Sequence, residues 1–113
     1  MYKIVFFVPE QQKEAVKSAL FAAGAGRFRN YEHCSWETDG TGQFRPLEDA
    51  DPFIGTPGTV ERVAEFRVEM ICRDEVIASA VDALINAHPY EEPAYEVFRV
   101  FTRDDLKEDS HDQ

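Results

Sequence analysis

The spacing of apolar residues predicts alternating strands and helices along the chain. Residues 2–8 are apolar on both alternating faces, as in a central strand that is covered on both sides. Pro9 then opens a segment in which apolar residues recur at helical spacing from Val16 to Ala23. Gly24 follows directly and is typical of the end of a helix. The first part of the chain therefore predicts a strand followed by an amphipathic helix.

The middle of the chain predicts a short ribbon and an irregular loop. Residues 31–37 suit a strand, and residues 38–42 have the composition of a hairpin turn. Residues 47–58 show no periodicity and contain Pro52, Gly55, Pro57 and Gly58. Loops of this length often carry function, so we expect more than a connection here.

The second half repeats the strand and helix pattern. Residues 61–72 alternate regularly, and one face carries Ala64, Phe66, Val68, Met70 and Cys72. Asp74 can cap a second helix with one apolar face, and Pro89 stops that helix. Residues 94–101 predict a last strand with apolar residues on both faces.

This order of elements predicts an α+β fold. The arrangement is ferredoxin-like βαββαβ, an antiparallel sheet with both helices on one face and a β-hairpin extension. Two helices cover one face only, so Val5, Phe7 and one side of the last strand are left without cover. Apolar area of this size on a monomer marks an interface, and we therefore expect a homo-oligomer.

Length and charge exclude several classes of protein. The 113 residues support a single core, which we place in residues 1–103 and follow with an acidic, disordered tail over residues 104–113. With 22 acidic against 12 basic residues the net charge is -10, which disfavours nucleic acid and anionic lipid as partners. The apolar start is too short for a signal segment or a membrane span, so we expect a soluble, cytoplasmic protein. Cys34 and Cys72 are too few for a disulfide framework.

The segment His88-Pro89-Tyr90-Glu91-Glu92-Pro93-Ala94-Tyr95 gathers an imidazole, carboxylates and phenols between a helix and a strand. One interpretation is structural: Pro89 stops the helix and His88 hydrogen-bonds nearby carbonyls. The other is a polar pocket, because imidazole nitrogen and carboxylate oxygen suit a divalent metal or a small polar ligand.

Such a site needs residues from elsewhere in the chain. The candidate ligand-binding set is Asn30, His33, Gly55, His88, Tyr90, Glu91, Glu92 and Tyr95. Within it, His33, His88 and Glu91 are the candidate metal ligands. His33 and Cys34 are adjacent on a predicted strand and point to opposite faces, so they do not form a pair of ligands. We predict no catalytic residue, because Cys34 lacks a recognisable orienting arrangement.

Four separate stretches carry a resemblance to a known family. They are residues 24–36, residues 40–46, Pro52-Phe53-Ile54-Gly55 and residues 87–95. Together they resemble the inserted domain of the YqfO-type, Nif-three-like dinuclear-metal proteins, over residues 1–103. The resemblance implies a CutA-like or PII-like fold, trimeric assembly and a sensing or binding role. In the longer members a separate flanking domain holds the metal ions, so the resemblance implies a free-standing insert domain here and no metal-hydrolase activity.

These observations predict a non-enzymatic, oligomeric module that binds a small ligand or regulates, with a trimer favoured over a dimer. We expect its site where the 88–95 turn, the 30–36 strand and the 47–58 loop meet. One alternative is a small metal-dependent enzyme or metal-binding protein that uses His33, His88 and Glu91. Another is a docking module for a larger protein partner.

Overall fold

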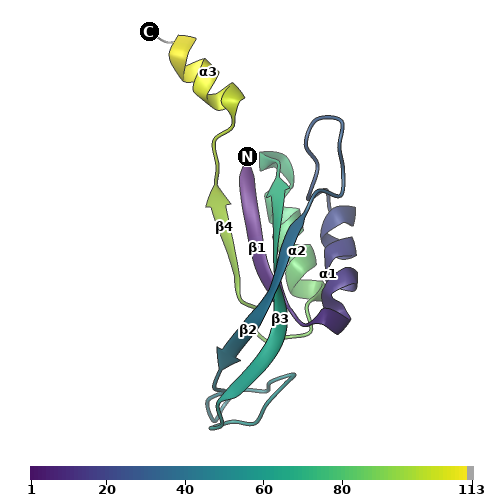
Figure 1. Cartoon of the computed structure of the whole chain (residues 1–113), viewed down its shortest axis with the longest axis vertical. Helices are drawn as coiled ribbons and strands as arrows, with labels where there is room; N and C mark the ends of the chain where they lie inside the picture. The colour runs from purple at the N-terminus through teal and green to yellow at the C-terminus, as the bar shows by residue number, and fades with distance from the viewer. Residues whose placement is uncertain (112–113) are drawn as a thin grey trace.

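An antiparallel sheet in the order β2-β3-β1-β4 forms the centre of the protein (Figure 1). The computed structural model describes residues 1–111. Its strands are β1 (Tyr2–Val8), β2 (Trp36–Phe44), β3 (Glu61–Cys72) and β4 (Tyr95–Arg99). The helices are α1 (Glu10–Ala22), the 3-10 turn η1 (Asp74–Val76), α2 (Ile77–Ala87) and α3 (Arg103–His111). In this described part, no helix is long and apolar enough to cross a membrane.

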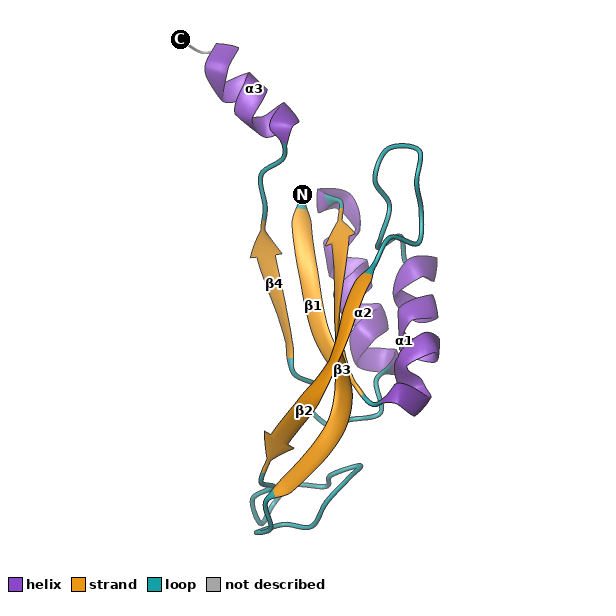
Figure 2. Ribbon diagram, viewed as in Figure 1, coloured by secondary structure: helices purple, strands orange, loops and turns teal. Residues whose placement is uncertain are grey.

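Helices α1 and α2 lie together on one face of the sheet, and the other face has no helix over it (Figure 2). Two antiparallel neighbours flank β1, so it is a central strand as its apolar pattern predicts. The α+β, ferredoxin-like fold predicted from the order of elements is therefore confirmed.

The hydrophobic core fills the space between the sheet and these two helices. The even-numbered residues of β1 face the helices, and Phe6 lies opposite Val68 of β3. The buried core residues are Ile4, Phe6, Val8, Val16, Leu20, Ala25, Val68, Met70, Cys72, Ala80 and Leu84. The inward face predicted for residues 61–72 is correct from Phe66 onward, because Phe66 is partly buried and packs against the core. Ala64 is exposed, because β3 extends past the helices at this end (Figure 1).

Strand β2 differs from the sequence prediction. The predicted turn over residues 38–42 is wrong, because β2 runs straight through it and pairs with β3 from Trp36 to Phe44. Gly40 lies opposite Glu65 in this ladder, so the glycine that suggested a turn is a strand residue. The chain reverses later, in residues 45–60. Trp36 is 58% exposed at the start of the strand.

The open face of the sheet is partly covered by its own charged side chains. Val5 lies on this face and is nevertheless fully buried. Its ladder partner Glu69 forms an ion pair with Lys3 at 3.1 Å and accepts a hydrogen bond from Arg67 at 3.1 Å. Val5 therefore needs no second subunit to be buried. Strand β4, in contrast, is exposed along its whole length.

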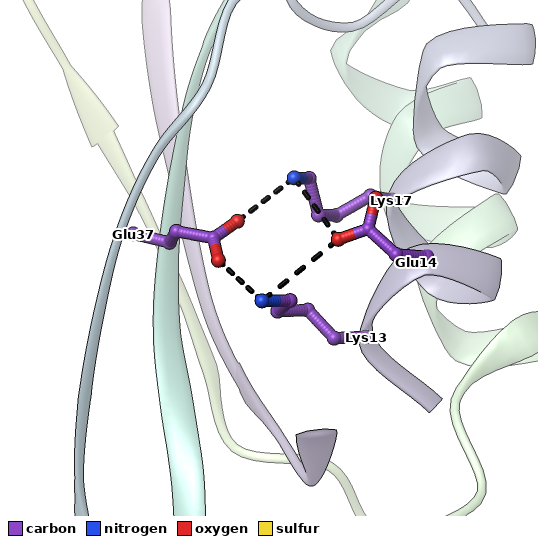
Figure 3. A network of polar contacts seen from close by, with 4 residues as sticks. All are labelled: Lys13, Glu14, Lys17 and Glu37. Carbon is purple, nitrogen blue, oxygen red and sulfur yellow. Dashed lines mark hydrogen bonds and ion pairs between the residues drawn. The ribbon is translucent and has the colours of Figure 1, made fainter. Parts of the chain in front are cut away.

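A polar network ties β2 to α1 on the helix-covered side (Figure 3). The Glu37 carboxylate accepts hydrogen bonds from Lys13 and from Lys17, the latter at 2.8 Å, and Glu14 contacts both lysines. The Lys13 ammonium also lies 3.8 Å from the centre of the Phe66 ring. The Lys13 and Lys17 hydrogen bonds lower the pKa of Glu37. Burial alone would lower the pKa of Lys17, but Glu37 and Glu14 outweigh it and the pKa is raised.

Helix α3 occupies most of the segment that the sequence predicts to be disordered. At its start the Asp105 carboxylate accepts from the Thr102 N–H at 2.8 Å and from the Thr102 hydroxyl at 3.2 Å, which is one half of a capping box. Asp104 also forms an ion pair with Arg29 at 3.1 Å. These contacts favour a helix in this polar segment. Residues 112–113 of the predicted tail lie outside the described residues, and a domain boundary at residue 103 stays a prediction.

Candidate functional site

His88 is a structural joint between α2 and β1. It follows the last residue of α2, and its N–H donates to the Leu84 carbonyl at 2.8 Å. Its Nε2 lies 2.6 Å from the Phe7 carbonyl oxygen, and its Nδ1 accepts from the Tyr90 N–H at 3.1 Å. These partners require the neutral tautomer with hydrogen on Nε2. The ring is buried, and burial lowers the pKa of His88.

Tyr90 connects this joint to the open face of the sheet. Its ring meets the edge of His88 with the centroids 4.7 Å apart, and its hydroxyl donates to the Glu65 carboxylate at 3.1 Å. Burial and the neighbouring Glu65 charge raise the pKa of Tyr90, so the phenol keeps its proton. Glu65 in turn lies over Gly42, where an added Cβ would fall 1.9 Å from its Oε1. The glycine thus makes room for the carboxylate that holds Tyr90.

A cleft of about 250 Å³ opens beside Tyr90. The chain segments that line it are the end of β2, the following loop to residue 54, and residues 90–94. The rings of Phe44 and Phe53 each lie 6.3 Å from the Tyr90 ring, and Phe7 completes the aromatic lining. The charged residues of the wall are Arg45, Glu65, Glu91 and Glu92.

Backbone contacts hold the loop against the 88–95 turn. The Asp51 N–H donates to both oxygens of the Glu91 carboxylate, at 3.1 and 3.2 Å. Gly55 has a φ of +97°, and an added Cβ would fall 2.7 Å from Cγ of Glu61. A side chain at this turn would therefore be strained and crowded. The contact between Asp51 and Glu91 brings the 47–58 loop and the 88–95 turn together.

The structure separates the remaining candidates from this cleft. Asn30 and His33 belong to the connection between α1 and β2, which lies at the opposite end of the sheet from the 45–60 loop (Figure 1). His33 stacks on Phe21 with the centroids 4.6 Å apart. Tyr95 pairs with Phe6 and so faces the helix side of the sheet. Of the predicted ligand-binding set, Tyr90, Glu91 and Glu92 line the cleft, while His88 and Gly55 support its walls.

The predicted metal set is not assembled. His33 is at the far end of the sheet, the ring nitrogens of His88 bond to Phe7 and Tyr90, and Glu91 accepts from Asp51. Among the side chains that the structure describes, no group of three or more His, Cys, Asp or Glu residues could hold a metal ion. The arrangement therefore offers an aromatic and acidic cleft in place of an imidazole-centred site.

Sequence reasoning missed the aromatic residues Phe7, Phe44 and Phe53 and the carboxylate of Glu65. The strand pattern places Phe7 and Glu65 on the face away from the helices, but it does not tell which residue of that face meets a distant loop. The paired glycines 40 and 42 were the available signal. A strand that has glycine at alternate positions leaves space on one face for a neighbouring side chain.

The sequence matches one segment of longer curated proteins. No protein-family model matches the sequence. A GTP cyclohydrolase 1 type 2 homolog of Mycobacterium tuberculosis is 51% identical over 96 residues, which is 85% of this chain and 25% of that protein. The chain thus spans about a quarter of the length of the curated relatives that it matches.

Solved structures agree with the fold. A Bacillus cereus protein related to NIF3 aligns with a TM-score of 0.77 and 40% identity, over 89% of this chain and 26% of that one. The PII-like protein CutA from Nostoc aligns with a TM-score of 0.66 over 96% of this chain and 88% of that one. At 16% identity, the second likeness concerns the fold alone.

Proposed function

Because the chain is homologous to one segment of the Nif-three-like proteins and has a CutA/PII-like fold, we propose that it is a non-catalytic module that binds a small ligand and self-associates. The cleft beside Tyr90 is the binding site. Its residues replace the set predicted from sequence, of which Tyr90, Glu91 and Glu92 are retained.

The cleft itself carries this proposal. Its volume of about 250 Å³ is close to the lower end of ligand pockets, which suits a small molecule. Its lining combines aromatic rings with a few polar groups, the usual composition of a small-molecule site. The loop that forms one wall is fixed by the contact of Asp51 with Glu91, so the site is largely formed without a ligand.

A blocked cleft tests the proposal. Ala94 lines the cleft, and Ala94→Trp fills it; Ala64→Trp makes the same change at an exposed position of β3 outside it. We expect saturation-transfer NMR with a library of small polar and aromatic compounds to give signals with the wild type and with Ala64→Trp, and to lose them with Ala94→Trp. Circular dichroism checks that both variants fold. Signals that persist in Ala94→Trp, or their absence in the wild type, would overturn the proposal.

Self-association is proposed through β4. This strand forms one edge of the sheet, and Tyr95, Val97 and Phe98 are 36%, 39% and 44% exposed. An exposed edge strand with large apolar side chains is a template for pairing with another chain. The family resemblance favours a trimer over a dimer.

Light scattering coupled to size exclusion measures the assembly. We expect an oligomer at micromolar concentration that Val97→Asp dissociates, because a carboxylate then lies in the contact. The control Glu96→Asp keeps the charge on the same strand and should leave the oligomer intact. A wild type that stays monomeric would rule out this part of the proposal, whereas a dimer would retain the β4 contact and remove the argument for a trimer.

A further inference from the structure

Three aromatic rings are grouped in the cleft. The ring centroids of Phe44 and Phe53 each lie 6.3 Å from that of Tyr90, and their planes make angles of 50° and 43° with the Tyr90 ring. Aromatic faces carry partial negative charge, so rings grouped in this way attract a cation placed between them. Neutral ligands gain no comparable electrostatic attraction from the arrangement.

Carboxylates reinforce this preference. The wall contains three carboxylates, Glu65, Glu91 and Glu92, and one cation, Arg45, so its net formal charge is −2. Glu65 is held in place by the Tyr90 hydroxyl, and the space that it occupies exists because residue 42 is glycine. Glu91 is held by the Asp51 N–H. Two of the three carboxylates are therefore positioned before any ligand arrives.

We propose that the cleft binds a small organic cation, a protonated amine or a quaternary ammonium group, between the rings of Phe44, Phe53 and Tyr90. This inference rests on the proposed ligand cleft and names the chemistry that the cleft selects. The rings provide the cation–aromatic contacts, and the carboxylates provide the counter-charge. Arg45 also lines the cleft, and its charge opposes binding of a ligand that carries only positive charge.

A pair of isosteric probes isolates the charge. Choline and 3,3-dimethyl-1-butanol have nearly the same shape, but a neutral carbon replaces the quaternary nitrogen in the second. We expect choline to bind at least about tenfold more tightly in NMR titrations, because a cation–aromatic contact within a partly desolvated site contributes about that factor. The preference should shrink as salt is added, since the carboxylates are partly exposed.

Substitutions assign the preference to the cleft. Phe53→Leu keeps an apolar side chain and removes the ring, so choline binding should weaken severalfold while binding of the neutral probe stays. Glu65→Gln should weaken choline binding and still accept the Tyr90 hydrogen bond. Arg45→Ala should strengthen it. Glu96→Gln removes a charge from the same sheet face outside the cleft and should change choline affinity least.

The outcomes separate this inference from the proposed function. Equal affinity for the two probes, or tighter binding of the neutral one, would overturn the cation inference and leave the ligand cleft intact. Binding of choline that is unchanged by Phe53→Leu and by Ala94→Trp would also overturn it, because the cation would then bind elsewhere. If neither these probes nor any compound of the library binds in the cleft, the cation inference and the proposed function fail together.

Discussion

The two glycines of β2 provide a matched pair of substitutions. Gly40 and Gly42 lie on the same face of the same strand, and both have backbone angles that alanine adopts without strain. A Cβ at Gly40 meets nothing within 4 Å, whereas a Cβ at Gly42 would fall 1.9 Å from Oε1 of Glu65. Gly42→Ala therefore displaces the Glu65 carboxylate, and Gly40→Ala does not.

The expected magnitudes follow from two opposing effects. Alanine in a strand is more stable than glycine by about 0.5–1 kcal/mol, so Gly40→Ala should stabilise the protein by that amount. Gly42→Ala has the same gain but loses the hydrogen bond from Tyr90 to Glu65, and a bond to a charged group contributes about 1.5–3 kcal/mol. The net effect of Gly42→Ala is then a destabilisation of about 0.5–2.5 kcal/mol.

Urea denaturation followed by circular dichroism, at one protein concentration, measures both changes in the free energy of unfolding. Repeating them in a Tyr90→Phe background completes a double-mutant cycle. Without the hydroxyl there is no bond to lose, so Gly42→Ala should become as favourable as Gly40→Ala. If the two alanine variants have equal stability in the wild-type background, Glu65 is not held over Gly42 and the account of this wall of the cleft is wrong.

Two further substitutions test polar groups whose pKa is shifted by their surroundings. His88 has a lowered pKa in the folded state, so the unfolded chain binds more protons than the folded protein once the pH falls below about 6.5. The free energy of unfolding of the wild type should therefore decrease as the pH falls below that value, and that of His88→Phe should change less. Urea titrations across pH measure both. Glu37 also has a lowered pKa, so its stabilisation is present above its ordinary pKa and is lost as the pH falls through the folded value. Glu37→Gln should therefore lower the melting temperature at neutral pH, and its melting temperature should fall less in acid than that of the wild type. If the melting temperatures of the two proteins fall equally in acid, the contacts of Glu37 with Lys13 and Lys17 do not stabilise the fold.

The sequence predicts those parts of the fold where one physical effect dominates. Val68, Met70 and Cys72 recur at every second position, and burial against two helices enforces that spacing. Gly40 and Gly42 mislead, because glycine suits a turn in isolation, whereas here both are strand residues and Gly42 faces a carboxylate from another strand. Which residues these glycines face depends on the pairing of segments that are distant in the sequence.

The candidate site shows the same limit. The 88–95 turn was recognisable because prolines and polar groups crowd one short segment. Whether His88 points to a ligand or to a carbonyl depends on the end of β1, which lies far away in the sequence. The pattern of residues 31–37 predicts that His33 lies on a strand, but His33 has a φ of 58° and lies in an irregular connection. No local pattern distinguishes these possibilities.

The pairing of β1 has a consequence for synthesis of the chain on the ribosome. Both neighbours of β1 come later in the sequence: Phe6 pairs with Val68 and with Tyr95. At about 5–20 residues per second, the roughly 60 residues between Phe6 and Val68 take roughly 3–12 s to make. Throughout that interval, Ile4 to Val8 is an apolar, strand-forming segment without a partner, of the kind that nucleates intermolecular β-sheets. Lys3 and Pro9 flank it directly, and a charge and a proline at such positions oppose pairing between chains before β3 is available.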